Sequence, residues 1–377
     1  MFSTKKTNFL MLALVCFLVF SMGCEEKTKP GSAISKPEPA KAAPAEVKSV
    51  EPLAVEKADA KPVEVKPADV KPVDVESCKA EGVKVPALVL NFADKALDVY
   101  KVTTEYSKGV AFEGEVSDKS SFRGGKTGSD IEIVFSSEVV SVDPQGNAVE
   151  KIAINSVKYK AFVKDNPVVD FDSSREKDKV SPLFGLIGKS YTIKMAANGK
   201  MLSVFDANEI RQAVAGGSST HKAAQSLVSD EIIAQRHGSV ILPGDEKVAA
   251  DTTWKELESF DFGLMGTQTY EKVYKVDSAD DAKSLTVSMN GLPSSEKAEE
   301  IHKEQKTSDF SKMFDNNESY AGKLVFDSAA GKVKSYSEKL DASWLAVDPA
   351  AGKADPNGVP AALTMSVVKG FSIEKVN

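Results

Sequence analysis

The chain has 377 residues, of which 42% are hydrophobic, and it carries a formal net charge of −7. The acidic surplus argues against nucleic acid as a partner, because phosphate backbones attract basic proteins. Only three cysteines occur, Cys16, Cys24 and Cys78, so no disulfide framework holds the fold and its stability must come from ordinary burial.

The first residues follow the plan of an export signal. Lys5 and Lys6 form a short basic start, and an apolar run extends from Phe9 to Phe20 before small residues follow. The run is too short to span a bilayer, which takes about 20 apolar residues. We therefore expect residues 1–23 to be a signal peptide.

The residues FSMGC, which end at Cys24, resemble the lipobox of bacterial lipoproteins. In that family a dedicated signal peptidase cuts before a cysteine whose sulfur carries diacylglycerol. The resemblance implies cleavage between Gly23 and Cys24, with Cys24 as the acylated first residue of the mature chain. Acyl chains then anchor the protein, since each buried methylene contributes about 0.8 kcal/mol. The alternative is an ordinary secreted protein that is cut elsewhere in this region.

The residue after the lipobox cysteine bears on the location. In this family an Asp at that place often favours retention in the inner membrane, and Glu25 stands there in this chain. The resemblance therefore implies a lipid-anchored protein of the cell envelope, in the outer membrane and facing the periplasm or the cell surface.

Residues 24–80 are expected to form a lipidated N-terminus followed by a disordered tether. From Lys61 the sequence reads KPVEVKPADVKPVDV, in which proline fixes φ and alternating charges keep the segment soluble. Extended at about 3.1 Å per residue, the tether would reach on the order of 150 Å. The repeats could instead bind an anionic polymer. Cys78 ends the tether, either as a free thiol or in an intermolecular disulfide.

Residues 81–240 are expected to be a β-rich half that ends in helices. The stretch ALDVYKVTTEY alternates Tyr100, Val102 and Thr104 on one strand face. The stretches IEIVFSSEVVSV and AVEKIAINSVKYKAFV flank a turn at DPQGN, and a change of parity in the second predicts a β-bulge near Ser156.

A further hairpin and two helical segments complete this half. Asn198-Gly199 predicts the turn of the hairpin in SYTIKMAANGKMLSVFD. DANEIRQAV predicts a short helix with Asp206 as its N-cap, and STHKAAQSLVSDEIIAQRHG predicts one mostly helical stretch that stops at Gly238.

Residues 241–377 are expected to be a second β-rich half. TQTYEKVYKVDS, KSLTVSMNGLP, ESYAGKLVFDSAAGKVKSYSEKL and ALTMSVVKGFSIEKV read as four or more strands, interrupted by a charged helix at about Ser295 to Lys306. Each half contains a hairpin that begins at a tyrosine, Tyr191 in the first and Tyr320 in the second, so the two halves could be an internal duplication. The predicted fold class is α+β, a predominantly antiparallel β-sheet with a few packing helices.

No motif carries a recognisable chemistry. GLIGKS at Gly185 and RGGKT at Arg123 lack the first glycine of a phosphate-binding loop, and the strand pattern that follows GLIGKS stands where that loop needs a helix. The histidines His221, His237 and His302 lack metal-binding spacing and are expected to be solvated. We expect no catalytic residue, no metal ligand, no cofactor and no enzymatic activity; the alternative is a pair of carboxylates brought together by folding.

The whole chain resembles an uncharacterised group of bacterial lipoproteins that share a lipobox, a low-complexity spacer and a β-rich domain with an L-x-G-K-x-Y segment, here LIGKSY. The resemblance supplies no catalytic residues. It implies attachment to the membrane through N-terminal acyl chains, with an envelope protein or the cell wall as the partner.

Two functions remain open, a non-enzymatic binding or scaffold module and a carrier of an apolar or lipid ligand in a curved-sheet cavity. The candidate lining residues of a carrier are aromatic or methionine residues at alternating strand positions: Tyr100, Tyr159, Met195, Met289 and Met365. Its candidate lid is the helix around Glu299 with the extension from Phe310 to Phe314. Aromatic residues make up only 7% of the chain, which favours the scaffold and predicts no stoichiometric lipid.

Overall fold

The computed structural model divides the chain into two units, Met1–Glu81 and Gly82–Asn377. All described residues belong to the second unit, and they are 88–93, 96–113, 124–244, 248, 251–280, 284–294, 314–347 and 362–376. The expected signal peptide, lipobox, tether and charged helix lie outside the described residues.

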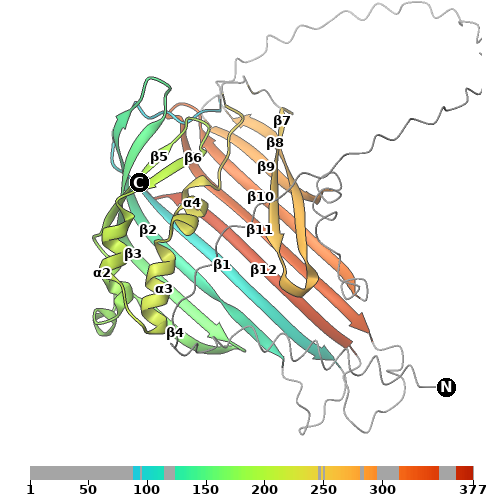
Figure 1. Cartoon of the computed structure of the whole chain (residues 1–377). Coiled ribbons are helices and arrows are strands. Elements are labelled where there is room, and N and C mark those ends of the chain that lie inside the picture. Colours follow the sequence, from blue (N-terminus) through green and yellow to red (C-terminus); the bar gives the residue numbers. More distant parts are fainter. Residues whose placement is uncertain are drawn as a thin grey trace, which may run out of the picture. The chain divides into compact units, whose positions relative to one another are not determined.

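In the part of the chain that the structure describes, twelve strands form one sheet in which every pairing is antiparallel (Figure 1). The predicted fold class, a predominantly antiparallel sheet with a few packing helices, is confirmed. The strands are β1 (Asp98–Glu113), β2 (Gly125–Val142), β3 (Ala148–Val163), β4 (Asn166–Asp172), β5 (Ser190–Met195), β6 (Met201–Phe205), β7 (Thr253–Asp261), β8 (Thr267–Asp280), β9 (Ser284–Pro293), β10 (Asp315–Asp327), β11 (Lys332–Val347) and β12 (Ala362–Lys375).

The strand order places the first and last strands of the sheet side by side. The order is β6-β5-β3-β2-β1-β12-β11-β10-β9-β8-β7, and β4 pairs with β3. Strands that follow one another in sequence are mostly neighbours in the sheet. The chain runs from β1 in the middle of the sheet to β6 at one edge, crosses to β7 at the other edge, and returns strand by strand to β12 beside β1. Strands from residues 81–240 and 241–377 therefore share one continuous sheet.

Local signals placed several of these strands correctly. The predicted bulge lies at Asn155, because Val134 pairs with Ser156 while the next residue, Phe135, pairs with Ile154. The turn between β5 and β6 contains Gly199 at φ 83, as a tight hairpin requires. The sequence interpretation did not identify β4 or β7 as strands.

Three short α-helices belong to the described residues: α2 (Ala207–Ala213), α3 (Ser219–Leu227) and α4 (Asp230–Gly238). The 3₁₀ turns are η1 (Glu176–Asp178), η2 (Pro182–Leu186) and η3 (Gly263–Met265). The helical stretch predicted to end at Gly238 is two helices, because Ser229 caps α4 by accepting a hydrogen bond from the Ile232 N–H. Asp206 precedes α2 in a left-handed conformation, and its side chain makes no capping hydrogen bond.

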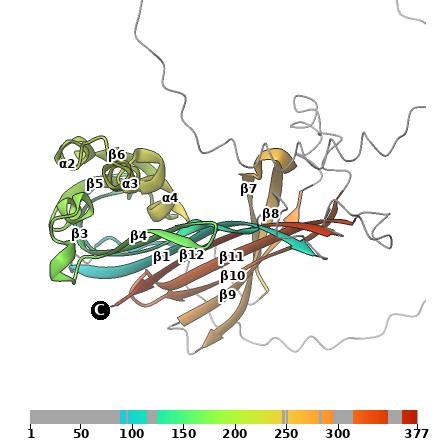
Figure 2. The same ribbon diagram turned by 90° about the horizontal axis from the view of Figure 1, so that it is seen from below.

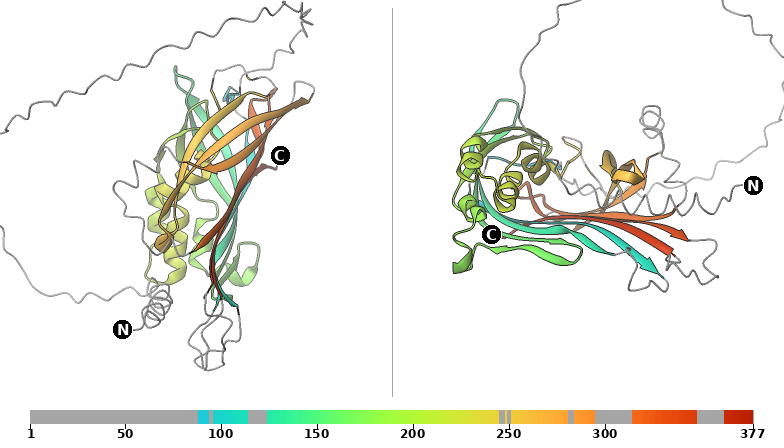
Figure 3. Two further views of the ribbon diagram at one scale, coloured as in Figure 1. Left: turned by 90° about the vertical axis from the view of Figure 1, so that its right-hand side faces the viewer. Right: turned by 60° about the horizontal axis from the view of Figure 1, so that its bottom comes forward.

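The helices and the connected end of the β7–β8 hairpin lie on the same side of the sheet (Figures 2 and 3). Helix α2 packs on β5, α4 packs on β6, and α3 packs on η2. The hairpin rises over the sheet at the opposite edge (Figure 1). Between the helices and the hairpin, this arrangement leaves a region of the sheet face that neither of them covers.

Candidate functional site

One face of the sheet forms the floor of the site. Val102 of β1 lies opposite Ile133 of β2 and Ile373 of β12, and directly opposed residues of an antiparallel pair point to the same side. Leu227 of α3 lines the same cavity as Val102 and Ile133, so this is the face that the helices cover.

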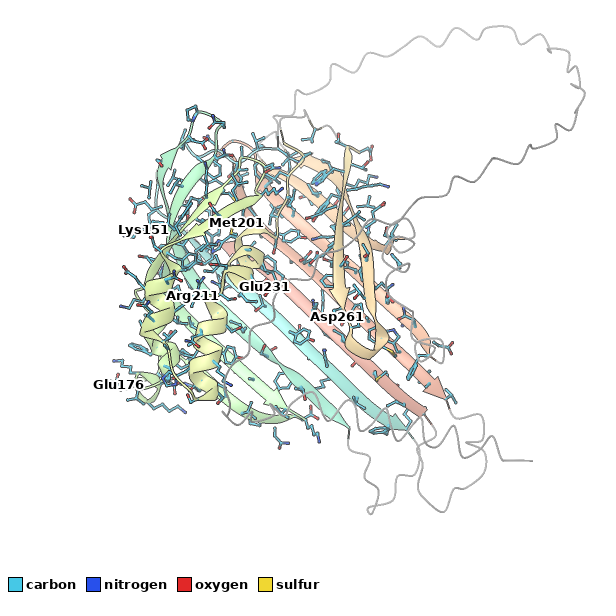
Figure 4. All side chains as sticks on the ribbon, viewed as in Figure 1. Lys151, Glu176, Met201, Arg211, Glu231 and Asp261 are labelled. Atoms are coloured by element: carbon cyan, nitrogen blue, oxygen red, sulfur yellow. The ribbon has the colours of Figure 1, made fainter. Side chains whose placement is uncertain are left out.

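A cavity of about 390 Å³ lies on this face. Its walls come from helices α3 and α4, from the outer end of β7, and from strands β1–β3 and β10–β12. Figure 4 labels Glu231 on α4 and Asp261 at the end of β7, and β1 and β12 run between them in that view. The volume falls within the roughly 300–1,000 Å³ that small-molecule sites occupy.

The lining of the cavity on the helix side combines a group of apolar side chains with Ser226, Gln235 and Arg236. Ile131 and Ile133 of β2 face Leu227 of α3 and Ile232 of α4 across the cavity, and Tyr159 of β3 lies at its side. Ile133 and Leu227 are 3% and 4% exposed, so this wall is largely shielded from solvent. Replacing water on such a surface with an apolar group is favourable, because it removes apolar area from water.

The wall on the hairpin side contains a buried charge cluster. Lys272 of β8 is 2% exposed, and its Nζ lies 2.9 Å from Glu258, 2.9 Å from Glu338 and 3.7 Å from Glu256. One ammonium group thus serves three carboxylates, and Glu258 and Glu338 also line the cavity. We call these four residues the Lys272 cluster.

Tyrosine hydroxyls complete the Lys272 cluster. The Tyr320 hydroxyl lies 2.9 Å from Glu258 and from Glu338, and the Tyr336 hydroxyl donates to Glu338 at 2.6 Å. Burial and the adjacent carboxylates raise the pKa of both tyrosines well above the usual range. Both side chains therefore stay protonated.

The charges of the Lys272 cluster respond to burial in opposite ways. Burial disfavours the charged form of Lys272, but the three surrounding carboxylates together raise the pKa of Lys272. Burial also raises the pKa of Glu256, so Glu256 takes up a proton more readily than an exposed glutamate. Protonation of Glu256 reduces the surplus of negative charge around Lys272.

A glycine on β9 makes room for the Lys272 cluster. Gly291 pairs with Lys272, and a Cβ atom at position 291 would lie 2.2 Å from the ring of Tyr320. The absence of that atom lets the Tyr320 ring lie against β9 and reach the two carboxylates. The cluster therefore joins β7, β8, β10 and β11 across the intervening strand.

Two further cations line the cavity. Arg236 of α4 is 5% exposed and donates from Nη1 to the Tyr191 hydroxyl at 3.2 Å and from Nη2 to the Leu227 carbonyl at 2.7 Å. The Lys369 Nζ lies 4.2 Å from the centre of the Phe260 ring, a cation–π contact. Burial lowers the pKa of Lys369.

His237 of α4 is half-buried and hydrogen-bonded, which corrects the expectation that it is solvated. Its Nε2 lies 2.7 Å from the Tyr191 hydroxyl, and its ring packs edge-on against Phe135. The Tyr191 oxygen accepts from Arg236, so its proton can be donated to Nε2. Burial and the Arg236 charge lower the pKa of His237 to about 3.

A second, smaller cavity of about 110 Å³ lies near the other end of β1. Tyr100, Met195, His237 and Glu150 are among its lining residues. Burial raises the pKa of Glu150, whose carboxylate accepts from the Ser137 hydroxyl at 2.5 Å. This volume is below the usual range of small-molecule sites.

The structure separates the candidate lining residues of a carrier. Tyr159 lines the larger cavity, while Tyr100 and Met195 line the smaller one. Met289 and Met365 are buried at 1% and 8% exposure and line neither of these two cavities. They belong to the ordinary core.

Other predicted residues lie elsewhere. Gly23, Cys24, Cys78, Glu299 and Phe310 lie outside the described residues. The GLIGKS segment runs from the end of η2 into β5 and is a strand entry, as expected. No group of His, Cys, Asp or Glu side chains in the described ranges could hold a metal ion. None of the described helices is both long and apolar enough to cross a bilayer.

The sequence interpretation missed the Lys272 cluster and Arg236. The alternation of Glu256, Glu258 and Phe260 places them on one face of β7, and Tyr270, Lys272 and Tyr274 alternate in the same way on β8. That spacing was a signal that could have grouped these residues. It does not reveal which face is buried.

Comparison with known proteins yields distant structural similarities. No protein-family model and no curated protein matches the chain. A lipovitellin structure titled for lipid–protein interactions aligns at 10% identity with a TM-score of 0.38, covering 76% of this chain and 26% of lipovitellin. DynF of the dynemicin biosynthesis pathway from Micromonospora chersina aligns at 7% identity and a TM-score of 0.16, covering 81% and 92%. Pseudomonas aeruginosa OpdQ aligns at 8% identity and 0.17, covering 75% and 100%.

These identities and scores are too low to assign the chain to any of the three folds. The chain spans about a quarter of the lipovitellin chain that it matches.

Proposed function

We propose that this protein is a carrier that binds an apolar or amphipathic small molecule in the cavity between the helices and the β7–β8 hairpin. The observation that supports it most is the cavity itself, about 390 Å³ and lined by both apolar and charged side chains. The sequence alone favours a scaffold, because few strand positions are aromatic. The cavity changes that preference, since a scaffold needs no internal space.

This mixed lining suits a ligand with two chemical ends. An apolar body would contact Ile131, Leu227 and Ile232, where it displaces water from shielded surface. The polar end would lie near Arg236 and Lys369, the two cations that line the cavity. A purely apolar ligand would leave these cations without a hydrogen-bonding partner from the ligand.

The test is binding of an environment-sensitive alkyl fluorophore, with a variant that fills the cavity. Ala223 of α3 lines the cavity and is half-buried, so Ala223→Trp adds an indole to that space. The control Ala213→Trp changes an exposed residue of α2. We expect one fluorophore per chain, binding at least about tenfold weaker in Ala223→Trp and unchanged in Ala213→Trp. Equal binding by both variants, or none by the wild type, would refute the carrier.

We further propose that acyl chains on Cys24 tether this carrier to a membrane of the cell envelope, where an amphipathic ligand is available. The support is the resemblance of FSMGC to a lipobox. Cys24→Ser should leave an uncleaved or soluble precursor. Detergent partitioning with intact-mass analysis measures this, and a wild-type chain of unmodified mass in the aqueous phase would end the proposal.

A further inference from the structure

Arg236 is a buried cation whose charge is not neutralised by a carboxylate. A guanidinium keeps its proton at any ordinary pH, so it cannot escape burial by becoming neutral. No ion pair joins Arg236 to an acidic side chain among the described residues, and the other two described arginines have such pairs. Arg175 contacts Asp170 and Asp178, and Arg211 contacts Asp230.

Arg236 uses only some of its N–H donors in hydrogen bonds. Its two bonds go to the Tyr191 hydroxyl and to the carbonyl of Leu227, the last residue of α3. That carbonyl carries the partial negative charge of a helix C-terminus, so Arg236 also stabilises the end of α3. A guanidinium has five N–H donors, and the remaining donors are available to an anion in the cavity that Arg236 lines.

The other charged side chains that line the cavity are Glu105, Glu258, Asp261, Glu338 and Lys369, and Glu105 is exposed to solvent. Glu258 and Glu338 both contact Lys272, whereas Lys369 makes no ion pair with any described residue. Asp261 lines the cavity but is exposed to solvent. The two cations that line the cavity are therefore Arg236, which is 5% exposed, and the half-buried Lys369, and neither makes an ion pair within the described ranges.

We propose that the ligand carries one acidic group, a carboxylate or a phosphate monoester, which pairs with Arg236 inside the cavity while Lys369 supplies a second positive charge. This assignment rests on the proposed carrier function and adds the chemical class of the ligand. A planar guanidinium binds either group through two parallel hydrogen bonds. A free fatty acid and a lipid phosphate share this chemistry.

The experiment is native mass spectrometry of the full chain with three ligands of equal chain length: dodecanoic acid, dodecyl phosphate and dodecanol. We expect adducts of the acid, the phosphate or both, with dodecanol bound about tenfold more weakly, the discrimination that one charged hydrogen-bonded pair provides. An acid-only result identifies a carboxylate ligand, and a phosphate-only result identifies a lipid phosphate. Both results support the proposal.

Two variants assign the selectivity to Arg236. R236Q should lose the preference for acidic ligands and keep the weaker dodecanol adduct, which also shows that the cavity is intact. R211Q removes an arginine of α2 that does not line the cavity, and it should keep the preference. K369Q, which leaves the cap of α3 in place, should weaken the acid adduct if R236Q does not fold.

The outcomes separate the two proposals. Equal binding of acid, phosphate and alcohol by the wild type, or full selectivity in both R236Q and K369Q, would overturn the acidic head group and leave the carrier. No adduct with any of the three ligands would overturn the carrier itself.

Discussion

The two parts of the sheet bury the same face by different means. Over β1–β6 the helices provide the cover, and the buried side chains there are largely aliphatic, such as Ile152, Ile193 and Ile233. Over β7–β12 the sheet is covered by its own edge hairpin, and the buried side chains include Lys272, which three half-buried glutamates surround, and a group of tyrosines.

This difference follows from what each cover brings. A helix presents an apolar stripe to the sheet, whereas a hairpin that curls over the sheet brings long side chains from several strands to one point. Charges that meet there must be paired and hydrogen-bonded, which the Lys272 cluster achieves with Tyr320 and Tyr336. The cavity lies between the two kinds of cover, and both apolar and charged side chains line it.

The largest expected effect comes from removing the central cation of the hairpin part. Lys272→Met leaves three glutamates around an apolar side chain, and it should lower the free energy of unfolding by about 3–5 kcal/mol. Urea denaturation measures this. Lys275→Met on the same strand breaks the exposed pair with Asp251 and should cost at most about 1 kcal/mol. Equal effects of the two variants would show that the hairpin part does not depend on its buried charges.

A smaller effect is expected from Gly291→Ala. The new Cβ would lie 2.2 Å from the Tyr320 ring, so the ring must move away from Glu258 and Glu338. The free energy of unfolding should fall by about 1–3 kcal/mol. Gly217→Ala, at a position with open space around the new Cβ, is the control and should not destabilise the protein. A stable Gly291→Ala protein with normal tyrosine absorbance would contradict this packing.

The helix-covered part should show its own dependence on pH through His237. The folded state keeps His237 neutral down to about pH 3, while the unfolded chain takes up a proton below its ordinary value of 6.5. Between these values the unfolded state binds more protons, so stability falls as pH falls, by up to about 1.4 kcal/mol per pH unit. Glu150 and Glu256, whose pKa values are raised, contribute with the opposite sign.

The variant His237→Gln isolates this contribution, because both glutamates remain in it. Its free energy of unfolding, measured by denaturation at a series of pH values, should fall less steeply below pH 6.5 than that of the wild type. Parallel curves for the two proteins would show that His237 is not kept neutral by burial.

The smallest expected effect on stability comes from Tyr270 of β8, which lies outside the Lys272 cluster. Tyr270 donates to Glu318 at 2.6 Å, and Glu318 also accepts from Gln268. Tyr270→Phe should therefore cost only about 0.5–1.5 kcal/mol by thermal or urea unfolding. A loss as large as that of Lys272→Met would mean that this tyrosine belongs to the Lys272 cluster.

Local sequence signals were sufficient for the hairpins and the bulge. Asn198-Gly199 specifies a tight turn, and the change of parity near Ser156 specifies an extra residue, because both depend only on neighbouring residues. β7 was missed because its inward-facing positions include Glu256 and Glu258, so the strand has no apolar alternation. Burial of these residues depends on pairing with strands far away in the sequence.

The candidate site could not be predicted from the sequence for the same reason. A lysine is almost never fully buried unless it is paired, and the partners of Lys272 come from β7 and β11. Arg236 and Lys369 meet at one cavity although more than a hundred residues separate them in the chain. Helical spacing also misled the interpretation at Ser229, where a capping hydrogen bond starts a new helix.

The most direct test of the carrier is a crystal structure of the chain with a fatty acid brominated near its apolar end. We expect one anomalous bromine peak in the larger cavity, near Ile131 and away from Arg236, with the carboxylate at Arg236. A cavity that holds only ordered water, or bromine peaks confined to the outer surface, would contradict it.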